Sequence, residues 1–137
     1  MKVTIPGGKD YVYMATLGIG ISRLLQIIAN KNHDNNGIIW PKEIAPFMVT
    51  IICNKERVDE ANILAQTLSE LKISNLVDKR DISLPRKLID FEMTGIPTSV
   101  VLGNNTKNGH CEIKFRKSKN NIFCSTKKVA KIIYNKS

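Results

Sequence analysis

The sequence has no apolar run close to the roughly 20 residues that a membrane-spanning helix needs. Its opening stretch, MKVTIPGGKDYVYM, lacks the unbroken apolar core of a signal peptide, so a cytoplasmic or organelle-matrix protein is expected. Cysteine and histidine are also scarce. Cys53, Cys111 and Cys124 are far apart in the sequence and form no metal-ligand spacing with His33 or His110, so we expect reduced structural thiols and no metal site.

Motifs for common enzyme chemistry are missing as well. The sequence contains no Walker loop, no Rossmann glycine fingerprint and no Ser, His and Asp set typical of nucleophilic catalysis. Gly18 and Gly20 flank Ile19 just before an apolar helical stretch and could cradle a phosphate beside Arg23. A lone GxG more often marks a simple break in the backbone pattern, which is the alternative for these residues.

Acidic residues are nearly absent from the last quarter of the chain. Residues 107–137 hold nine Lys or Arg against the single acid Glu112, whereas residues 1–106 are almost neutral. Essentially all of the net charge of +9 therefore belongs to the C-terminal quarter. This asymmetry indicates a polyanionic partner such as nucleic acid, with a solvated lysine-rich surface as the alternative.

The patterns that are present predict one domain with a short appendage, which suits a chain of 137 residues. Alternation predicts a strand at 11–16, and residues 22–31 are expected to form a helix. Pro41 and Pro46 forbid a regular helix or central strand between them, so 37–44 is predicted to be a stiff linker. Beyond it, periodicity predicts strands at 47–53, 75–80, 98–103, 110–117 and 122–124, with helices at 57–72, 85–93 and 126–134.

This order of elements predicts an α/β fold. Strands that alternate with helices and then run into a meander are expected to form a mixed five-stranded sheet with three helices, which lie on both of its faces. A short strand–helix segment precedes this unit. The strand at 110–117 alternates apolar and charged residues, so it is predicted to be half exposed, with Phe115 packed in the core.

Three stretches of the sequence carry a resemblance to a known family. LGIGISRLL (17–25) resembles motif 3 of class II aminoacyl-tRNA synthetases, whose arginine contacts ATP. DNNGIIWPKEIAPF (34–47) is similar to the join between the catalytic and anticodon-binding domains of prolyl-tRNA synthetases. DKRDISLPRKLIDFEMTGIP (78–97) is similar to the Asp-x-Arg, Lys, Glu and Gly-Ile-Pro segment of that family, and VVLGN and GHCEIKFRK follow in the expected order.

The resemblance covers roughly residues 11–134 and implies a domain organisation. Residues 1–36 would be the end of a catalytic domain, 37–44 a linker, and 45–137 an anticodon-binding domain. Gly18, Gly20 and Arg23 would bind ATP, with Mg²⁺, only in the parent enzyme. The chain itself, whether trimmed or naturally short, is expected to bind tRNA without cofactors and without aminoacylation activity.

The resemblance also implies partners. These are the anticodon stem-loop of tRNA(Pro) and the upstream catalytic domain of a homodimeric parent, with no membrane. Because the sheet that would bury the first helix is absent from these 137 residues, we expect its apolar side chains to pack on 45–134 or to associate between chains. Two alternatives stay open: an accessory protein-interaction module with the same fold, and a small phosphate-binding enzyme built on the GxG segment.

Residues for reading a proline anticodon, which the resemblance implies contains two adjacent guanines, are concentrated in 78–97. A guanine offers N1–H and N2–H₂ to a carboxylate, and O6 and N7 to a cation. Candidates for these contacts are Asp78, Asp90 and Glu92 with Arg80 and Lys87, while phosphate contacts are assigned to Lys114, Arg116, Lys117 and Lys119.

Each of these candidates has an alternative. Asp78 and Arg80 could form a local ion pair, and Lys87 and Glu92 could be ordinary surface residues. Pro85 stands where the family usually has a glycine, so the loop before the helix is expected to approach RNA differently.

Overall fold

The computed structural model describes residues 2–5, 8–11, 15–104, 106–118 and 121–135. At its centre is a five-stranded sheet in the order β6-β5-β7-β8-β9. β5 pairs in parallel with both β6 and β7, and antiparallel pairing then adds β8 and β9. The strands are β5 (Val49–Cys53), β6 (Asn75–Asp78), β7 (Thr98–Leu102), β8 (His110–Phe115) and β9 (Asn121–Ser125).

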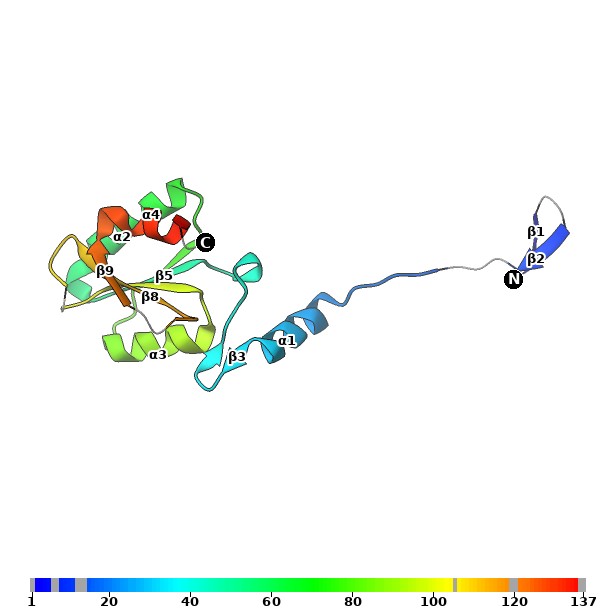
Figure 1. Ribbon diagram of the computed structural model, residues 1–137, viewed down its shortest axis with the longest axis horizontal. Helices are drawn as coiled ribbons and strands as arrows, with labels where there is room; N and C mark the ends of the chain where they lie inside the picture. Colours follow the sequence, from blue (N-terminus) through cyan, green and yellow to red (C-terminus); the bar gives the residue numbers. More distant parts are fainter. Residues whose placement is uncertain (1, 6–7, 12–14, 105, 119–120, 136–137) are drawn as a thin grey trace.

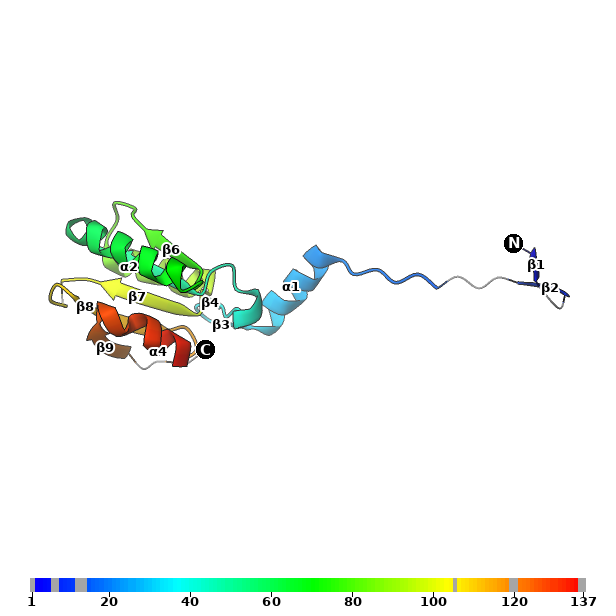
Figure 2. The ribbon, with the colours of Figure 1, turned by 90° about the horizontal axis from the view of Figure 1, so that it is seen from above.

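Helices cover both faces of this sheet (Figures 1 and 2). α2 (Val58–Glu70) and α4 (Val129–Asn135) lie side by side on one face, and α3 (Leu84–Thr94) packs on the other. β5 is therefore buried along its whole length, which explains its continuous apolar run. The larger core, beneath α2 and α4, includes Ile51, Leu64, Leu68, Val100, Leu102, Ile113, Val129 and Ile133; the smaller, beneath α3, contains Ile52, Phe91, Ile96 and Val101.

The predicted α/β class, five-stranded mixed sheet and three helices of this unit are confirmed. β8 is half exposed as predicted, and Phe115 packs against the larger core. 3₁₀ turns at Lys55–Arg57 and Thr126–Lys128 come before α2 and α4, so α2 begins one residue and α4 three residues later than expected.

The strand predicted at 11–16 is wrong over most of its described residues. β2 (Gly8–Tyr11) ends at Tyr11, Ala15 and Thr16 lie outside any strand, and residues 12–14 lie outside the described part of the chain. β2 instead forms a hairpin with β1 (Lys2–Ile5). Alternation identified extended residues here but could not reveal their partner.

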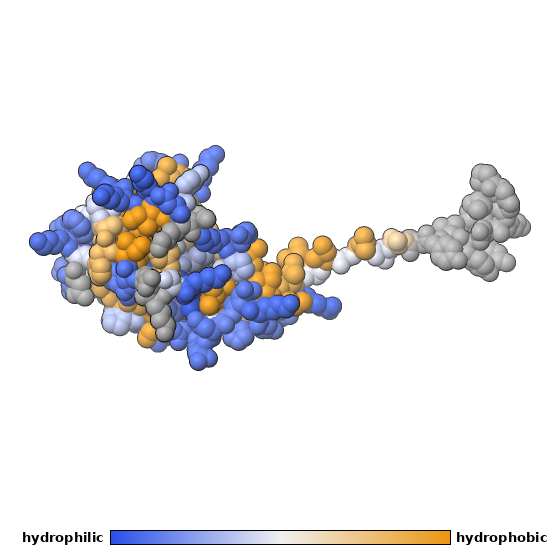
Figure 3. Space-filling model, in the orientation of Figure 1, coloured by the Kyte–Doolittle hydropathy of each residue, from blue (hydrophilic) through white to orange (hydrophobic). Residues whose placement is uncertain are grey.

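α1 (Ile21–Lys31) projects away from the sheet-containing unit (Figure 1), and none of its residues is buried. The expectation that its apolar side chains pack on 45–134 is therefore wrong, and their association with another surface stays a prediction. Figure 3 shows these apolar residues along α1 and the segment before it. These exposed apolar side chains are Leu17, Ile19, Ile21, Leu24, Leu25 and Ile27.

None of the helices in the described ranges is long and apolar enough to cross a membrane.

The segment after α1 is folded onto the end of α3. β3 (His33–Asp34) and β4 (Gly37–Ile38) form a short hairpin. The Trp40 indole Nε1–H then donates to the carbonyl oxygen of Thr94 at 3.0 Å, and the Trp40 backbone N–H donates to the carbonyl of Gly95. We therefore propose that the structural boundary of the domain lies before His33, earlier than the predicted linker at 37–44.

Gly95 makes this close packing possible. It ends α3 with φ +74°, and a Cβ at this position would overlap the carbonyl group of Ile38. Gly37, at φ +145°, makes the reciprocal approach to the backbone of Met93. Two glycines distant in sequence thus allow the hairpin and the helix end to touch.

Gly95→Ala is expected to destabilise the domain more than a positive φ alone explains. Gly109, at φ +79° with open space around its would-be Cβ, supplies the matched control. Gly109→Ala should lower the free energy of unfolding by about 1 kcal/mol, and Gly95→Ala by about 1–3 kcal/mol more because of the overlap. Urea unfolding of the two variants measures both values, and equal losses would mean that the hairpin does not pack on α3.

Candidate functional site

The candidate residues of 78–97 and of β8 lie on the same face of the sheet, the one that carries α3. The strand register places Asp78, Ile52, Val101, Glu112 and Phe123 in one row across all five strands. The neighbouring row contains Leu76, Thr50, Ser99, Lys114 and Asn121. α3 covers the middle of this face, so charged residues flank the helix on both sides.

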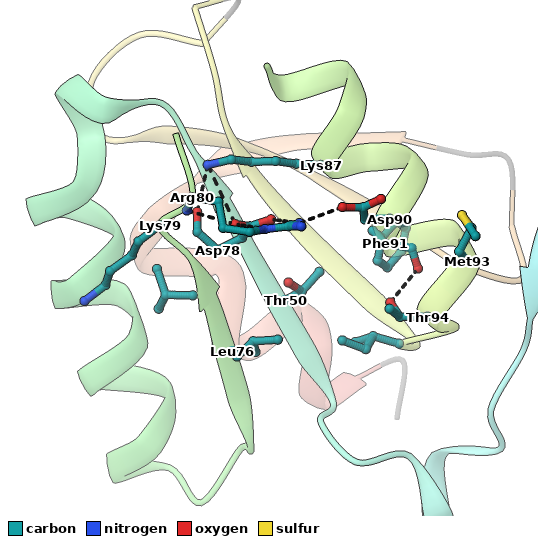
Figure 4. Close-up of a pocket in the computed structure, with 12 residues that line it drawn as sticks. Thr50, Leu76, Asp78, Lys79, Arg80, Lys87, Asp90, Phe91, Met93 and Thr94 are labelled. Carbon is teal, nitrogen blue, oxygen red and sulfur yellow. Dashed lines mark hydrogen bonds and ion pairs between the residues drawn. The ribbon is translucent and has the colours of Figure 1, made fainter. Parts of the chain in front are cut away.

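On the β6 side of α3, Arg80 bridges two carboxylates (Figure 4). Its Nε and Nη2 donate to the two oxygens of Asp78 at 3.0 and 2.7 Å, and Nη2 also lies 2.8 Å from an Asp90 oxygen. The groove below has a volume of about 740 Å³ and an apolar floor that includes Leu76 and Ile96. The Arg80 side chain is 55% exposed, so part of its guanidinium stays open to a ligand.

The charges in this cluster hold each other ionised. The hydrogen bonds from Arg80 lower the pKa of Asp78 despite its burial, and the two carboxylates raise the pKa of Arg80. Asp78 and Arg80 do form the local ion pair that was the alternative to base contact. Arg80 and Asp90 are the members of this cluster with the more accessible side chains.

Lys87 is not available to a ligand in this structure. Its side chain is only 3% exposed, and Nζ donates to the backbone carbonyls of Cys53 and Asp78, each at 2.9 Å. The ammonium thereby ties together the carboxyl ends of β5 and β6. This burial fits neither a base contact nor an ordinary surface position. Sequence spacing could not show that the side chain turns beneath the loop after β6.

Arg116 is committed to an internal contact as well. Its side chain is 4% exposed, and its two terminal nitrogens donate to the carboxylate of Asp34 at 2.6 and 2.7 Å. Nε donates to the backbone carbonyl of Glu92. The guanidinium lowers the pKa of Asp34, while Asp34 raises that of Arg116. A phosphate contact by Arg116 would require this pair to open, so we leave it out of the proposed interface.

The other candidates line the β8 side of α3. Glu92 accepts a hydrogen bond from Asn36 Nδ2 at 3.0 Å and shares a hollow with Lys114 and Lys117. Asp90 and Glu92, two residues apart on α3, therefore face opposite sides of the helix. Lys114 Nζ lies 3.6 Å from a Glu112 oxygen, and Lys117 is exposed. Lys119 lies outside the described residues.

The excess positive charge is divided between the two faces. Lys127, Lys128 and Lys131 are exposed around α4, on the side opposite α3. The patch beside α3 consequently contains fewer lysines than the sequence alone indicated. Composition showed where the positive charge lies along the sequence, but not on which face of the sheet each lysine stands.

The residues predicted to bind ATP are not assembled into a site. Gly18, Gly20 and Arg23 are all exposed around the start of α1. Gly20 has φ −80°, and open space surrounds the would-be Cβ of Gly18, so neither position needs glycine for a tight turn or a close approach. These residues do not fit a phosphate cradle in this structure, and we derive no ATP chemistry from them.

The thiols behave as buried structural groups. Cys111 and Cys124 face each other across β8 and β9 with their Sγ atoms 3.7 Å apart, although they are distant in sequence. Burial raises the pKa of Cys53 and of Cys111, which disfavours their reactive thiolate forms. Among the described residues, no three His, Cys, Asp or Glu side chains gather as metal ligands.

The mixed sheet with helices on both of its faces defines a compact α/β domain, with ion pairs on both sides of α3. The chain belongs to the anticodon binding domain family, whose sequence profile matches residues 47–136. The predicted resemblance is thereby confirmed, and the curated relatives bear it out as well.

Those relatives are proline–tRNA ligases. The chain is 38% identical to that of Nautilia profundicola over 109 residues, which cover 77% of this chain and 19% of the relative. It is 41% identical to that of Aliarcobacter butzleri over 110 residues, again 77% and 19% of the two chains. For Cutibacterium acnes the identity is 37% over 125 residues, or 88% and 21%. The chain thus spans about a fifth of the length of these relatives.

Proposed function

We propose that this chain is the part of a proline–tRNA ligase that binds the anticodon stem-loop of tRNA(Pro), in the cytoplasm. The observation that carries the proposal is the α3 face, where carboxylates and cations stand on one surface beside an apolar groove. Single-stranded bases are read by such mixed donor and acceptor groups, whereas phosphates are held by exposed cations. The family match supports the same role.

Within this face, Arg80, Asp90 and Glu92 are proposed to contact the bases. Arg80 retains exposed N–H groups suited to guanine O6 and N7, and the two carboxylates are acceptors suited to N1–H and N2–H₂. Lys114 and Lys117 are proposed to contact phosphates beside Glu92. Lys119 stays a candidate from the sequence.

The apolar side of α1 is proposed to pack on the catalytic domain of a homodimeric parent enzyme. The support is the exposure of Ile21 in α1 and of Leu17 and Ile19 just before it. Each of these side chains is at least 73% exposed, which is unfavourable in water without a partner surface. ATP and Mg²⁺ would belong to that domain.

The test of the proposed function is a titration with an RNA hairpin whose loop contains two adjacent guanines, at two salt concentrations. A hairpin with adenines at both positions is the control. The account predicts weaker binding at higher salt, because counterions are released from phosphates, and at least about tenfold tighter binding of the guanine loop. Binding that is insensitive to salt, or equal for the two loops, would contradict the proposal.

Arg80→Met should remove most of the guanine preference. The substitution keeps an unbranched apolar stem but removes the guanidinium, so affinity for the guanine loop is expected to fall about tenfold. Arg86→Met is the matched control, since Arg86 in α3 is 64% exposed and lies 3.4 Å from Asp90, the carboxylate that Arg80 also contacts. The control should stay within about twofold of the wild type. Equal effects of the two substitutions would rule out a specific role for Arg80.

A further inference from the structure

The half of the α3 face formed by β8 and β9 continues beyond the helix. α3 packs on Ile52 and Val101, and the row of side chains then runs on to Glu112 and Phe123. Phe123 is 66% exposed, although it lies within a strand and on a sheet face. With strands about 4.8 Å apart, the backbone of Phe123 is about 10 Å from that of Val101 and about 19 Å from that of Asp78.

Charged residues neighbour Phe123 in the sheet on the side toward α3. Glu112 is directly opposite Phe123 in the β8–β9 register, and Lys114 lies one row away with its ammonium 3.6 Å from Glu112. Both line a hollow of about 470 Å³ that is also lined by Asn54 and Asn104. An apolar surface thus stands beside acceptors, donors and one cation.

We propose that Phe123 is a stacking platform for one unpaired purine of a bound RNA loop, with Glu112 accepting hydrogen bonds from the base edge. The inference rests on the proposed function and adds a subsite to it that lies beyond the 78–97 segment. A base lying flat on the ring would direct its edge along the row toward Glu112. Guanine is favoured because its N1–H and N2–H₂ donors match a carboxylate, whereas adenine presents fewer donors.

The charge around the ring favours nucleic acid over an apolar protein partner. Glu112 is the single acid among residues 107–137, which contain nine Lys or Arg. Lys114 lies on the same face of the sheet as Phe123, and Lys117 follows just after the end of β8. Both can contact the phosphates of a bound RNA strand. Stacking on an exposed aromatic ring beside cations is a general way in which single-stranded nucleic acids are held.

Tyr134 provides a matched control for the experiment. It is 79% exposed, but it belongs to α4, on the opposite side of the sheet. Phe123→Leu and Tyr134→Leu therefore each remove one exposed aromatic ring, and only the first removes it from the α3 face. Phe123→Trp retains an aromatic surface and tests for rescue. Because the ring is mostly exposed, these variants should fold, which circular dichroism checks.

The experiment is titration of the full chain with the guanine hairpin, with 2-aminopurine placed at one loop position in turn. The proposal predicts that Phe123→Leu weakens binding about tenfold and abolishes quenching of one 2-aminopurine. Phe123→Trp should restore both, and Tyr134→Leu should change neither. The salt slope should be the same for the wild type and Phe123→Leu, because stacking does not involve counterions.

The outcomes separate this inference from the proposed function. A wild type that binds the hairpin with guanine preference, together with a Phe123→Leu variant of unchanged affinity and quenching, overturns the stacking platform and leaves the proposed function intact. A wild type that does not bind the hairpin overturns both. Equal losses for Phe123→Leu and Tyr134→Leu also overturn the platform, since they would show an effect unrelated to the α3 face.

Discussion

Lys87→Met is expected to lower the free energy of unfolding by about 2–4 kcal/mol. The substitution preserves most of the buried side-chain volume but removes two charge-assisted hydrogen bonds, from Nζ to the carbonyls of Cys53 and Asp78. Because the Lys87 side chain is only 3% exposed, water cannot replace these bonds without opening the end of the sheet. Urea unfolding followed by circular dichroism gives the difference directly.

Lys79→Met is the control for this prediction, since Lys79 is exposed beside the same groove. It should change stability by no more than about 0.5 kcal/mol. If Lys87→Met instead left stability unchanged and weakened RNA binding, the ammonium would have to reach the ligand. That result would restore the base contact predicted from the sequence and contradict the buried position.

Removing residues 1–36 should destabilise the domain, whereas removing residues 1–31 should not. Both truncations eliminate the exposed apolar side chains of α1, so both should reduce self-association in light scattering. Only the longer one removes Asp34, which leaves the Arg116 guanidinium buried without its carboxylate partner. The melting temperature of the 1–36 deletion should therefore be clearly the lower of the two.

A compensating substitution sharpens this comparison. In the 1–36 deletion, Arg116→Leu should recover part of the lost melting temperature because it removes the unpaired buried charge. In the 1–31 deletion the same substitution should lower the melting temperature, because it breaks an intact pair. Equal melting temperatures for the two truncations would show that the hairpin of Asp34 is not part of the domain.

The sequence was sufficient for the sheet and its helices because each element has a local signature. The buried β5 is a continuous apolar run, β8 alternates, and α3 begins beside Pro85 and ends at Gly95. The hairpin of β1 and β2 was missed because β2 contains glycine and aspartate, which are uncommon in strands. α1 was predicted correctly as a helix, but its apolar side chains are not buried on 45–134 as expected. Amphipathic periodicity does not identify the surface on which a helix packs.

The site was predictable by residue type but not by position. The Asp34–Arg116 pair joins residues 82 positions apart, so no spacing rule could have paired them. Lys87 is buried because its side chain reaches beneath the loop after β6, whereas helical periodicity alone places it near exposed neighbours. Phe123 was overlooked because only three residues of its strand, 122–124, were predicted from the sequence. Its place on the α3 face of the edge strand β9 follows only from the pairing with Glu112.

The most direct test of the account is a map of backbone amide chemical shifts during titration with the guanine hairpin. If the RNA binds the α3 face, shifts are expected at Arg80, Asp90, Glu92, Lys114 and Phe123, while residues of α2 and α4 stay unchanged. Shifts confined to Lys127, Lys128 and Lys131 would instead place the RNA on the opposite side of the sheet and contradict binding at the α3 face.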